Sequence, residues 1–334
     1  SCLTSIGRTL AGQADVLGIT EPKHNIQPQR SSAGITMQLK QQINNINAIR
    51  QCVDVKKVIQ DLEKLPKFKL NAKGERELRH RSHGADVAEV YSPPRITKLA
   101  SDMNLKAAWA LDLTVRDPDD DQPWDLSDPG KQAKTKKKIN EDKPLMLVVC
   151  PMCGPFSTMM NWNYAAMETE QVREILDKAM EHLKFALELC VMQHQAGRLF
   201  LFEHPVGASS WETEMIRTVA SLEGVHLAKF DFCQLDMKTK GKDGSEKPAK
   251  KRTTVLTNSQ HVAKVLREAQ CDGTHVHQQL VDGRAGPCQE YPEKFCRVVC
   301  QSIKREIDDI RWRKRLCREL DITQSLSAMI AATE

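Results

Sequence analysis

From residue 86 onward, short apolar runs alternate with longer segments in which apolar residues recur at helical spacing. Apolar runs of about four to eight residues are typical of strands buried on both faces, and the longer periodic segments are typical of amphipathic helices. Strands that alternate with helices fold into a mostly parallel sheet covered on both sides. The predicted strands are 86–92, 107–113, 144–150, 198–204, 224–232 and 252–258, and the clearest predicted helices are 96–103, 169–195 and 210–222.

This pattern predicts an α/β fold, with a Rossmann-like, doubly wound and mostly parallel sheet in residues 85–310. Residues 1–34 mix Gly, Pro, Ser and Gln without a period, which is typical of a disordered leader or linker. Residues 35–84 carry apolar residues at helical spacing and then a basic stretch, so we expect a helical extension and a linker. A further helix is expected from about residue 291, with 311–334 as a helical tail.

Composition narrows the class of protein. The 334 residues are 40% apolar and 28% charged, which is enough for a substantial core. No apolar run approaches the roughly 20 residues that cross a bilayer, and the N-terminus lacks the pattern of a signal peptide. Eleven scattered cysteines are then typical of reduced thiols. We expect an intracellular protein, nuclear or cytoplasmic, that has no membrane partner.

Polar residues follow the predicted strands where each strand ends. Glu89 and Ser92 belong to the end of the first strand and Asp112 to the end of the second. Cys153 follows the third strand in the turn PMCGPFS, and Glu203 closes the fourth. Open α/β sheets bind ligands at this edge, and an acid about 20 residues after the first strand-to-helix turn is where they hold a ribose hydroxyl. Asp112 fits that spacing, which indicates a nucleoside-containing cofactor.

Cys153 and Glu203 are the candidate catalytic residues. A thiolate in a strand-end turn is a good nucleophile when backbone N–H groups or cations lower its pKa, and a nearby carboxyl group can pass a proton. Each residue also has a simpler interpretation. Most free cysteines are small buried hydrophobic residues, and Glu203 could form a salt bridge to Arg198 or cap the following helix.

Two basic stretches stand out against a net charge of only +5. They are KQAKTKKK (131–138) and KTKGKDGSEKPAKKR (238–252). Such stretches are most often solvated loops, and contact with nucleic-acid phosphates is the alternative. The candidate nucleic-acid contacts are Lys238, Lys240, Lys242, Lys250, Lys251 and Arg252.

A separate group of residues has the side chains that zinc binds. The segment CDGTHVH supplies Cys271, His275 and His277, and Cys288 follows. Their spacing matches no standard zinc finger, so we expect no metal and interpret them as loop histidines and buried thiols. His275 and His277 would face one side of an extended chain, which also suits contact with a phosphate or a base.

Several of these motifs resemble a known family. Their order resembles that of the cytosine-C5 DNA methyltransferases, with PMC at the position of the family's Pro-Pro-Cys and FEHP at that of its Glu-Asn-Val. More specifically, the chain resembles a divergent methyltransferase-like domain found in retrotransposon polyproteins of unicellular eukaryotes. This resemblance covers roughly residues 86–309. It is carried by VAEVYSPPR, WALDLT, WDLS, CPMCGPFS, FEHP, TTVLTNS and EYPEKFC.

The resemblance implies a class I methyltransferase-like fold and a specific reaction. The Cys153 thiolate would attack C6 of a flipped cytosine, Glu203 would assist at N3, and C5 would take a methyl group from S-adenosylmethionine. Asp112 and Asp125 fall where the family contacts the ribose and adenine of the cofactor, and Glu89 and Ser92 complete the predicted cofactor set. The implied partners are nucleic acid, most directly DNA, and other domains of a longer polyprotein.

Three departures from the family leave other functions open. The glycine-rich turn after the first strand is replaced by Ser92-Pro93-Pro94-Arg95, which removes two backbone donors. His204 replaces an Asn that normally braces a neighbouring loop, and the family's arginine-rich motif has only Lys250, Lys251 and Arg252 as loose substitutes. The alternatives are a catalytically degenerate nucleic-acid-binding or scaffolding domain, and a different nucleotide-cofactor enzyme in which Cys153 only packs.

Overall fold

The computed structural model describes residues 84–241, 244–281 and 283–331. The predicted leader 1–34 and all but the last residue of the predicted extension 35–84 lie outside the described residues, and so does Lys242.

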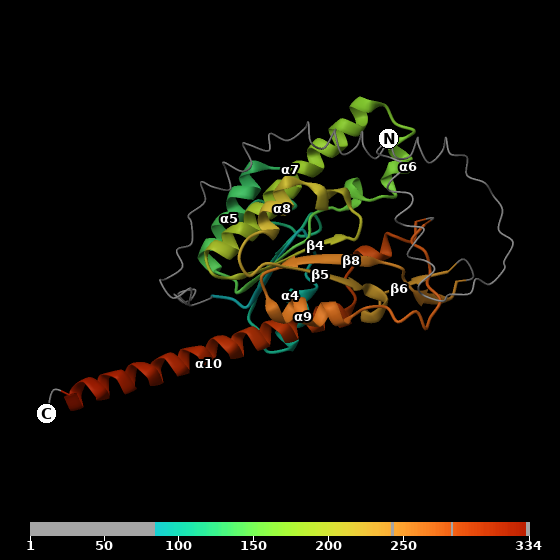
Figure 1. The fold of residues 1–334 in the computed structure, drawn as a ribbon. Helices are drawn as coiled ribbons and strands as arrows, with labels where there is room; N and C mark the ends of the chain where they lie inside the picture. The colour runs from blue at the N-terminus through green and yellow to red at the C-terminus, as the bar shows by residue number, and fades with distance from the viewer. Residues whose placement is uncertain (1–83, 242–243, 282, 332–334) are drawn as a thin grey trace, which may run out of the picture. The chain divides into compact units, whose positions relative to one another are not determined.

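A six-stranded mixed sheet forms the centre of the fold, with the strand order β2-β1-β3-β4-β8-β5 (Figure 1). The strands from β2 to β4 pair in parallel, and β8 runs antiparallel to both of its neighbours, β4 and β5. The predicted α/β class and the mostly parallel sheet are therefore confirmed. The strands are β1 (Val87–Val90), β2 (Ala107–Leu111), β3 (Met146–Val149), β4 (Leu199–Pro205), β5 (His226–Asp231) and β8 (Arg252–Thr257).

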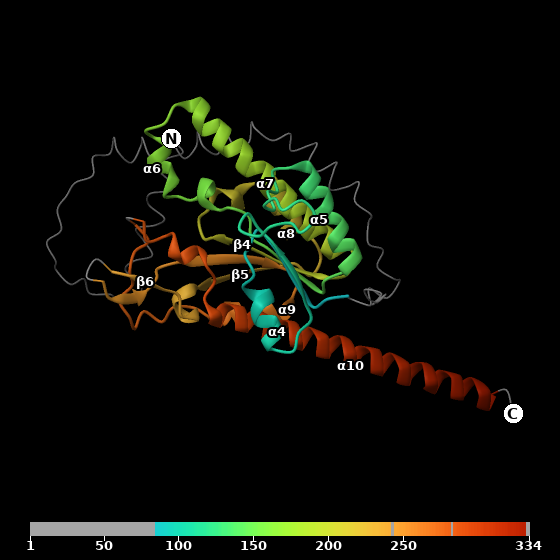
Figure 2. The same cartoon turned by 180° about the vertical axis from the view of Figure 1, so that it is seen from behind.

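Helices cover both faces of this sheet (Figures 1 and 2). One face packs against α5 (Pro129–Asp142), α7 (Thr169–Gln195) and α8 (Glu214–Ala220), and the other against α4 (Ile96–Asp102), α9 (Gln260–Glu268) and α10 (Glu293–Ala331). The sheet is thus doubly wound. Within the described part of the chain, no helix is both long and apolar enough to span a bilayer. The short elements are α6 (Met160–Tyr164), a two-stranded ribbon of β6 (Lys238–Lys240) and β7 (Glu246–Pro248), and the 3-10 turns η1 (Gly154–Phe156), η2 (Ser209–Glu212), η3 (Phe232–Leu235) and η4 (Pro287–Gln289).

The strand register decides which side chains share a face. Val90 pairs with Val149 and Val149 pairs with Phe202, and all three pack on the α7 side of the sheet. Since side chains alternate along a strand, Glu203 must point to the α10 side and His204 to the α7 side. The two polar residues at the end of β4 therefore serve opposite faces.

The strands that follow β1 in the chain lie on opposite sides of it in the sheet. From β1 the chain crosses outward to β2, and then it returns to β3 on the other side of β1. Such a change of side opens a ligand site at the carboxyl ends of the two central strands. The segments that begin at Tyr91 and Cys150 leave the sheet at this place, which positions the candidate site.

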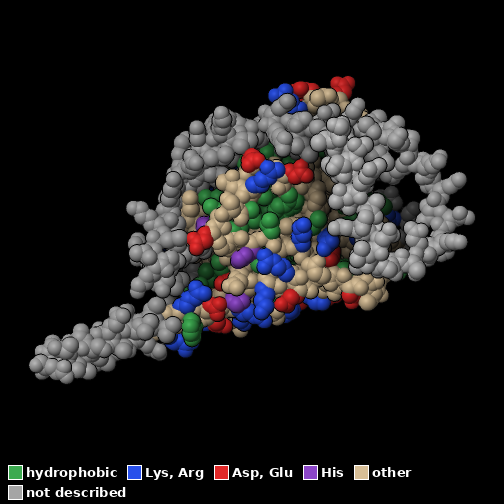
Figure 3. Space-filling model, in the orientation of Figure 1, with side chains coloured by type: hydrophobic (Ala, Val, Ile, Leu, Met, Phe, Trp, Pro, Cys, Tyr) green, Lys and Arg blue, Asp and Glu red, His purple; other side chains and the backbone are tan. Residues whose placement is uncertain are grey.

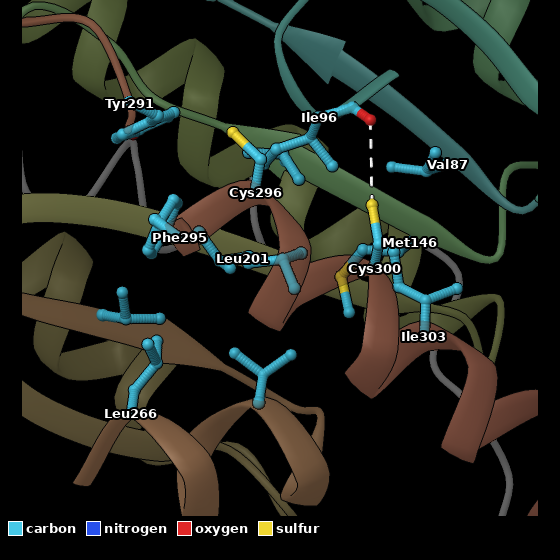
Figure 4. Close-up of a cluster of buried hydrophobic side chains, with 14 of the residues drawn as sticks. Val87, Ile96, Met146, Leu201, Leu266, Tyr291, Phe295, Cys296, Cys300 and Ile303 are labelled. Atoms are coloured by element: carbon cyan, nitrogen blue, oxygen red, sulfur yellow. Dashed lines mark hydrogen bonds between the residues drawn. The ribbon is translucent and has the colours of Figure 1, made fainter. Parts of the chain in front are cut away.

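The first turns of α10 close the second face of the sheet. Phe295, Cys296, Cys300 and Ile303 extend from this helix into a cluster that includes Val87, Met146, Leu201, Ile96 and Leu266 (Figure 4). The Cys300 thiol lies 3.8 Å from the carbonyl oxygen of Ile96, which ties α10 to the start of α4. Ile310, further along the helix, also packs against this cluster, and α10 continues unbroken across the predicted boundary at residue 311.

Three helices of the structure were not predicted from the sequence, namely α5, α6 and α9. The basic stretch 131–138, interpreted as a solvated loop or a phosphate contact, lies inside α5. The residues of α5 that face the sheet are Lys131, Thr135 and Ile139, so two of its three buried positions are polar and hide the helical period. Asp128 caps the helix, because its Oδ1 accepts a hydrogen bond of 2.8 Å from the Gly130 amide.

Buried charge pairs hold α5 to the acidic loop before it. Asp117 is fully buried and accepts hydrogen bonds of 2.7 Å from both Lys131 and Lys134. Although burial alone would raise its pKa, these two hydrogen bonds hold the pKa of Asp117 at about 2. Lys131 and Lys134 therefore neutralise acids of the loop, which accounts for this part of the basic run lying next to the acidic sequence DPDDD.

We expect Asp117→Ala to lower the free energy of unfolding by about 3 kcal/mol, because it leaves the buried Lys131 ammonium without its buried partner. Urea denaturation measures this change. The matched control is Glu141→Ala on the same helix, whose partner Lys137 is exposed, and which should cost less than about 1 kcal/mol. Equal losses for the two variants would contradict a structural role for the buried pair.

Candidate active site at the ends of the central strands

Glu203 is a buried carboxylate with one unused oxygen. It lies near the end of β4, and only 5% of the residue is exposed. Its Oε2 accepts a hydrogen bond of 3.3 Å from the hydroxyl group of Tyr291. Its Oε1 has no hydrogen-bond partner among the described residues. A buried oxygen left in this state costs free energy, and such atoms are typical of sites that bind a ligand.

Lys251 supplies a positive charge beside this carboxylate. Its Nζ lies 3.8 Å from Glu203 Oε1, too far for a hydrogen bond but close enough for a strong charge interaction. The same ammonium group donates to the Cys288 carbonyl oxygen at 3.2 Å and lies 4.7 Å from the centre of the Phe232 ring. The sequence analysis treated Lys251 as a phosphate contact, whereas the structure brings its side chain next to Glu203.

Cys153 lies in the turn that follows β3, at the start of η1. The residue is partly exposed. The next residue, Gly154, borders open space, because a side-chain Cβ built on it would meet no atom of a non-neighbouring described residue within 4 Å. Burial raises the pKa of the Cys153 thiol and the charge of Glu203 raises it further, while Lys251 lowers it. Cys153, Glu203 and Lys251 are thus electrostatically coupled, and the reactivity of the thiol depends on the balance of two opposite charges.

Cys150 and Tyr291 belong to the same group of residues, and the sequence analysis did not select either of them. Burial raises the pKa of Cys150 well above its usual value, Glu203 adds to this, and a hydrogen bond from Tyr291 opposes it. Burial also raises the pKa of Tyr291, so its hydroxyl group stays a neutral donor. Two features of the sequence could have indicated these residues. Cys150 ends the third apolar run, and Tyr291 directly precedes Pro292 and α10.

His204 braces the loop that carries Cys153. It is fully buried, and burial lowers its pKa to about 3, so the ring is neutral. Its Nε2 lies 3.3 Å from the Pro151 carbonyl oxygen and donates to it, and its Nδ1 accepts from the Ser210 hydroxyl group at 2.7 Å. The ring also packs against Phe156, with 5.8 Å between ring centres. His204 therefore holds the neighbouring loop.

Glu89, which was predicted together with Ser92 to bind a cofactor, caps the start of α4 in the structure. The carboxylate of Glu89 is fully buried and accepts hydrogen bonds of 2.9, 3.0 and 3.2 Å from the amides of Arg95, Ile96 and Thr97. Burial raises the pKa of Glu89 while these amides lower it. The Ser92 hydroxyl group donates to the Pro93 carbonyl oxygen at 3.0 Å. The amides at the start of α4 are therefore already used by a side chain of this protein.

Tyr91 takes the backbone conformation that glycine favours. Its φ is 60°, in the left-handed region that L-residues with side chains rarely adopt. Its hydroxyl group lies 3.0 Å from His182 Nδ1, and its ring packs edge-on against Phe185 on the same helix, α7. The tight turn after β1 is thus made without glycine, because contacts with α7 hold the tyrosine in place.

Asp112 and Asp125 lie in loops that follow β2. Asp112 is partly exposed, and one of its oxygens accepts from the amide of Thr114 at 2.9 Å. Asp125 is exposed and accepts from the amide of Ser127 at 2.9 Å, an interaction that lowers its pKa. The charge of Asp125 also raises the pKa of Tyr91, so this acid is close to the turn after β1. Both acids thus accept hydrogen bonds in the loops that follow β2.

The remaining basic candidates lie on β6, in the segment that follows the ribbon, and at the start of β8. Lys238 and Lys240 are exposed on one side of β6, with the buried Thr239 between them. Lys250 is exposed, and Arg252 lies 3.8 Å from Asp231. On the face that includes α9 and the start of α10, Lys and Arg are interspersed with Asp and Glu (Figure 3). The basic residues on that face therefore do not form one continuous surface.

The weak metal candidates separate into two places. Cys271, His275 and His277 come together with a fourth residue, Cys233, which the sequence analysis did not include. Cys288 is buried elsewhere, with its thiol 3.9 Å from the Lys238 carbonyl oxygen. A spacing rule within one segment could not select Cys233, because η3 and the segment after α9 are distant in the chain.

No protein-family model matches the chain, and comparison with curated proteins finds no match. Function is therefore inferred from the site itself. A thiol, a buried carboxylate with one unused oxygen, an ammonium group and a phenol converge where the two central strands end. Such a set can add a nucleophile to a polar, planar ligand and transfer a proton to it.

We expect Glu203→Gln to speed the alkylation of Cys153 by iodoacetamide several-fold near neutral pH, because it removes the negative charge that raises the pKa of the thiol. Lys251→Met should slow it, because it removes the charge that lowers this pKa. Mass spectrometry of the Cys153 peptide over a range of pH gives both rates. Lys238→Met on the exposed ribbon is the control and should change neither; equal profiles in all variants would contradict the coupling.

A second prediction concerns His204 and pH. The unfolded chain protonates this residue below about pH 6.5, whereas the folded protein keeps it neutral down to about pH 3. The stabilisation of the folded protein by the neutral His204 ring is therefore complete above pH 6.5. As the pH falls below this value, the free energy of unfolding decreases by about 1.4 kcal/mol per pH unit. Between pH 6.5 and 5, the wild type should lose about 2 kcal/mol more than His204→Asn in chemical denaturation. Parallel losses would show that the ring is protonated in the folded protein.

Proposed function

We propose that this domain is an S-adenosylmethionine-dependent, methyltransferase-like enzyme that acts on cytosine in DNA. The single observation that carries the proposal is the buried, unpartnered Oε1 of Glu203 beside the Cys153 thiol. A cytosine ring offers a ring nitrogen and an amino group that pair with a carboxyl group, and an electrophilic carbon that a thiolate can attack. The resemblance of the motifs around both residues supports the same reaction.

The steps assigned to this chain follow from the charges around the two residues. Binding of a flipped base brings a hydrogen-bonding edge to Glu203 Oε1, and the Glu203 carboxylate takes up the proton that the Cys153 thiol loses, holds N3 and passes this proton to it. This makes C6 more electrophilic, and the thiolate of Cys153 adds to it. Lys251 stabilises the thiolate, and His204 fixes the Pro151 carbonyl and with it the loop that carries the nucleophile. Once C5 has received its methyl group, its proton passes to solvent, the C5–H electron pair restores the C5–C6 double bond, and the C6–S bond breaks to release the thiolate.

The residues present fit the nucleoside part of the cofactor. Asp112 and Asp125 are acceptors for ribose hydroxyl groups and for the adenine amino group, and Tyr91 gives the turn after β1 the left-handed conformation that glycine usually supplies. Glu89 is used to cap α4, so we assign it no contact with the cofactor. When bound, S-adenosylmethionine supplies the methyl group that C5 receives.

The nucleic acid would contact residues near the ribbon of β6 and β7. Lys238, Lys240 and Lys250 are exposed in the same region of the chain that leads to Lys251. Lysines in this position neutralise phosphates without reading sequence. The resemblance also implies that the domain works within a longer polyprotein.

A second function is favoured by the start of α4. Its first amides are used by Glu89, and the preceding turn contains Pro93 and Pro94. Both features reduce the number of backbone donors that could face a cofactor. The alternative is therefore a domain that binds nucleic acid or other proteins and has no transferase activity.

The test uses DNA in which cytosine is replaced by 5-fluorocytosine, whose C5–F bond cannot release a proton. With S-adenosylmethionine, the wild type should form a covalent complex that survives denaturing electrophoresis. Cys153→Ser should form none, and Glu203→Gln should form it at least about 100-fold more slowly. The control is Cys190→Ala, which removes a thiol buried in α7 and should leave the complex intact.

The other outcomes separate the two functions. If the wild type forms no covalent complex and does not bind S-adenosylmethionine in calorimetry, yet binds DNA with an affinity that falls steeply with salt, the domain is a nucleic-acid-binding relative. If Cys153→Ser keeps the complex, another residue is the nucleophile and the proposed mechanism is wrong.

A further inference from the structure

Four side chains of the types that bind zinc converge at the end of β5. Cys233 comes from η3, directly after β5, and Cys271, His275 and His277 come from the segment that follows α9. One ligand atom from each lies within 4.8 Å of all the others. Two thiols and two imidazoles are a complete ligand set for a structural zinc ion.

The distances between these atoms match a tetrahedron around a single ion. With Zn–S of about 2.3 Å and Zn–N of about 2.0–2.1 Å, sulfur and nitrogen ligands are separated by about 3.5 Å and two nitrogens by about 3.3 Å. His277 Nε2 lies 3.4 Å from the sulfur of Cys271 and 3.3 Å from that of Cys233. His275 Nε2 lies 3.7 Å from the Cys271 sulfur and 3.1 Å from His277 Nε2.

Hydrogen bonding does not account for this arrangement. The Nε2 atom of His277 has three close polar neighbours, namely the sulfurs of Cys271 and Cys233 and the Nε2 atom of His275. An imidazole nitrogen has either one hydrogen or one lone pair in the ring plane, so it serves one such partner well. Three equidistant neighbours are what a shared central cation produces.

Groups around the cluster are oriented as partners of metal ligands. The Gly273 amide donates to the sulfur of Cys271 at 3.4 Å, and the Gln234 amide donates to that of Cys233. Asp272 Oδ1 lies 4.0 Å from Nδ1 of His275, the ring nitrogen that faces away from the cluster. Amides that donate to thiolates and carboxylates beside the outer nitrogen of a histidine are typical of metal sites.

We infer that Cys233, Cys271, His275 and His277 form a structural zinc site. All four positions of the tetrahedron are taken by protein ligands, so the site leaves none for a substrate. The inference does not depend on the proposed methyltransferase function, because none of its ligands contacts Cys153 or Glu203 in the described structure.

The site would fix a segment that leads to the candidate active site. The amide of Cys271 donates to Asp231 at the end of β5 at 3.0 Å. On the other side of the ligands, Gln278 donates to the Pro248 carbonyl oxygen at 2.8 Å and accepts from the Lys250 amide at 3.0 Å. The next residue is Lys251, beside Glu203. Zinc would thus fasten β5 to the chain that positions Lys251.

The test measures metal in the full chain. Wild type purified without chelator should contain close to one zinc per chain by mass spectrometry, and X-ray absorption should show two sulfur ligands at about 2.3 Å and two nitrogen ligands at about 2.0–2.1 Å. Cys271→Ser and Cys233→Ser should each lose most of the metal. Cys288→Ser is the matched control, because Cys288 is a buried cysteine nearby that is not part of the cluster.

A second measurement covers ligand variants that fail to fold. Wild type stripped of metal by a chelator should bind cobalt with the intense visible bands of a tetrahedral thiolate complex, and zinc should displace it. A wild type that contains no zinc and takes up no cobalt would overturn the inference. So would a disulfide between Cys233 and Cys271, or a control variant that loses as much metal as the ligand variants.

Discussion

The charge of Glu203 at the end of a strand buried on both faces is the constraint on which the rest of the site depends. Its immediate neighbours in the sheet are apolar, so its partners must come from other parts of the chain. Tyr291 approaches from the segment before α10, and Lys251 from the residue before β8. Oε1 accepts no hydrogen bond from the described residues, and a ligand could supply the missing donor.

At this edge of the sheet, residues on one face set the charge around Cys153, and residues on the other face hold its loop in place. On the α10 side, Glu203, Lys251 and Tyr291 set the charge around Cys153. On the α7 side, His204 packs among aromatic rings and holds the Pro151 carbonyl. Because consecutive residues of β4 point to opposite faces, one strand end both supplies the carboxylate and braces the loop of the nucleophile.

The inferred zinc site would brace the outer part of the sheet, near β5, as His204 braces the loop of Cys153. No residue of the segment 271–279 belongs to the buried apolar clusters of the described structure, and the ligand cluster joins this segment to the end of β5 at the place where the chain turns back toward Lys251. A short segment that buries few apolar side chains can be held in one conformation by metal ligands, because the free energy of metal binding stabilises the folded arrangement. The position of Lys251 would then depend on residues that do not contact the site.

Local pattern was enough to determine the alternation of strands and helices, and with it the α/β class, because buried strands and amphipathic helices have different periods of apolar residues. It also selected Cys153 and Glu203 as strand-end residues, since parallel strands end at one edge. The helix α5 was not visible, because its buried positions Lys131 and Thr135 are polar. Lys131 is paired with Asp117 and Asp120 of the preceding loop, and Thr135 donates to the Lys131 carbonyl oxygen within the helix.

The tertiary structure alone decided which distant residues meet. It brought Lys251 and Tyr291 to Glu203, used Glu89 as a helix cap, and joined Cys233 to Cys271 rather than Cys288. The physical reason is that sequence periodicity reports which side of an element is buried, whereas partners across the sheet are set by strand order and by loop paths. Strand order places β8 between β4 and β5, and no spacing rule within a segment contains that information.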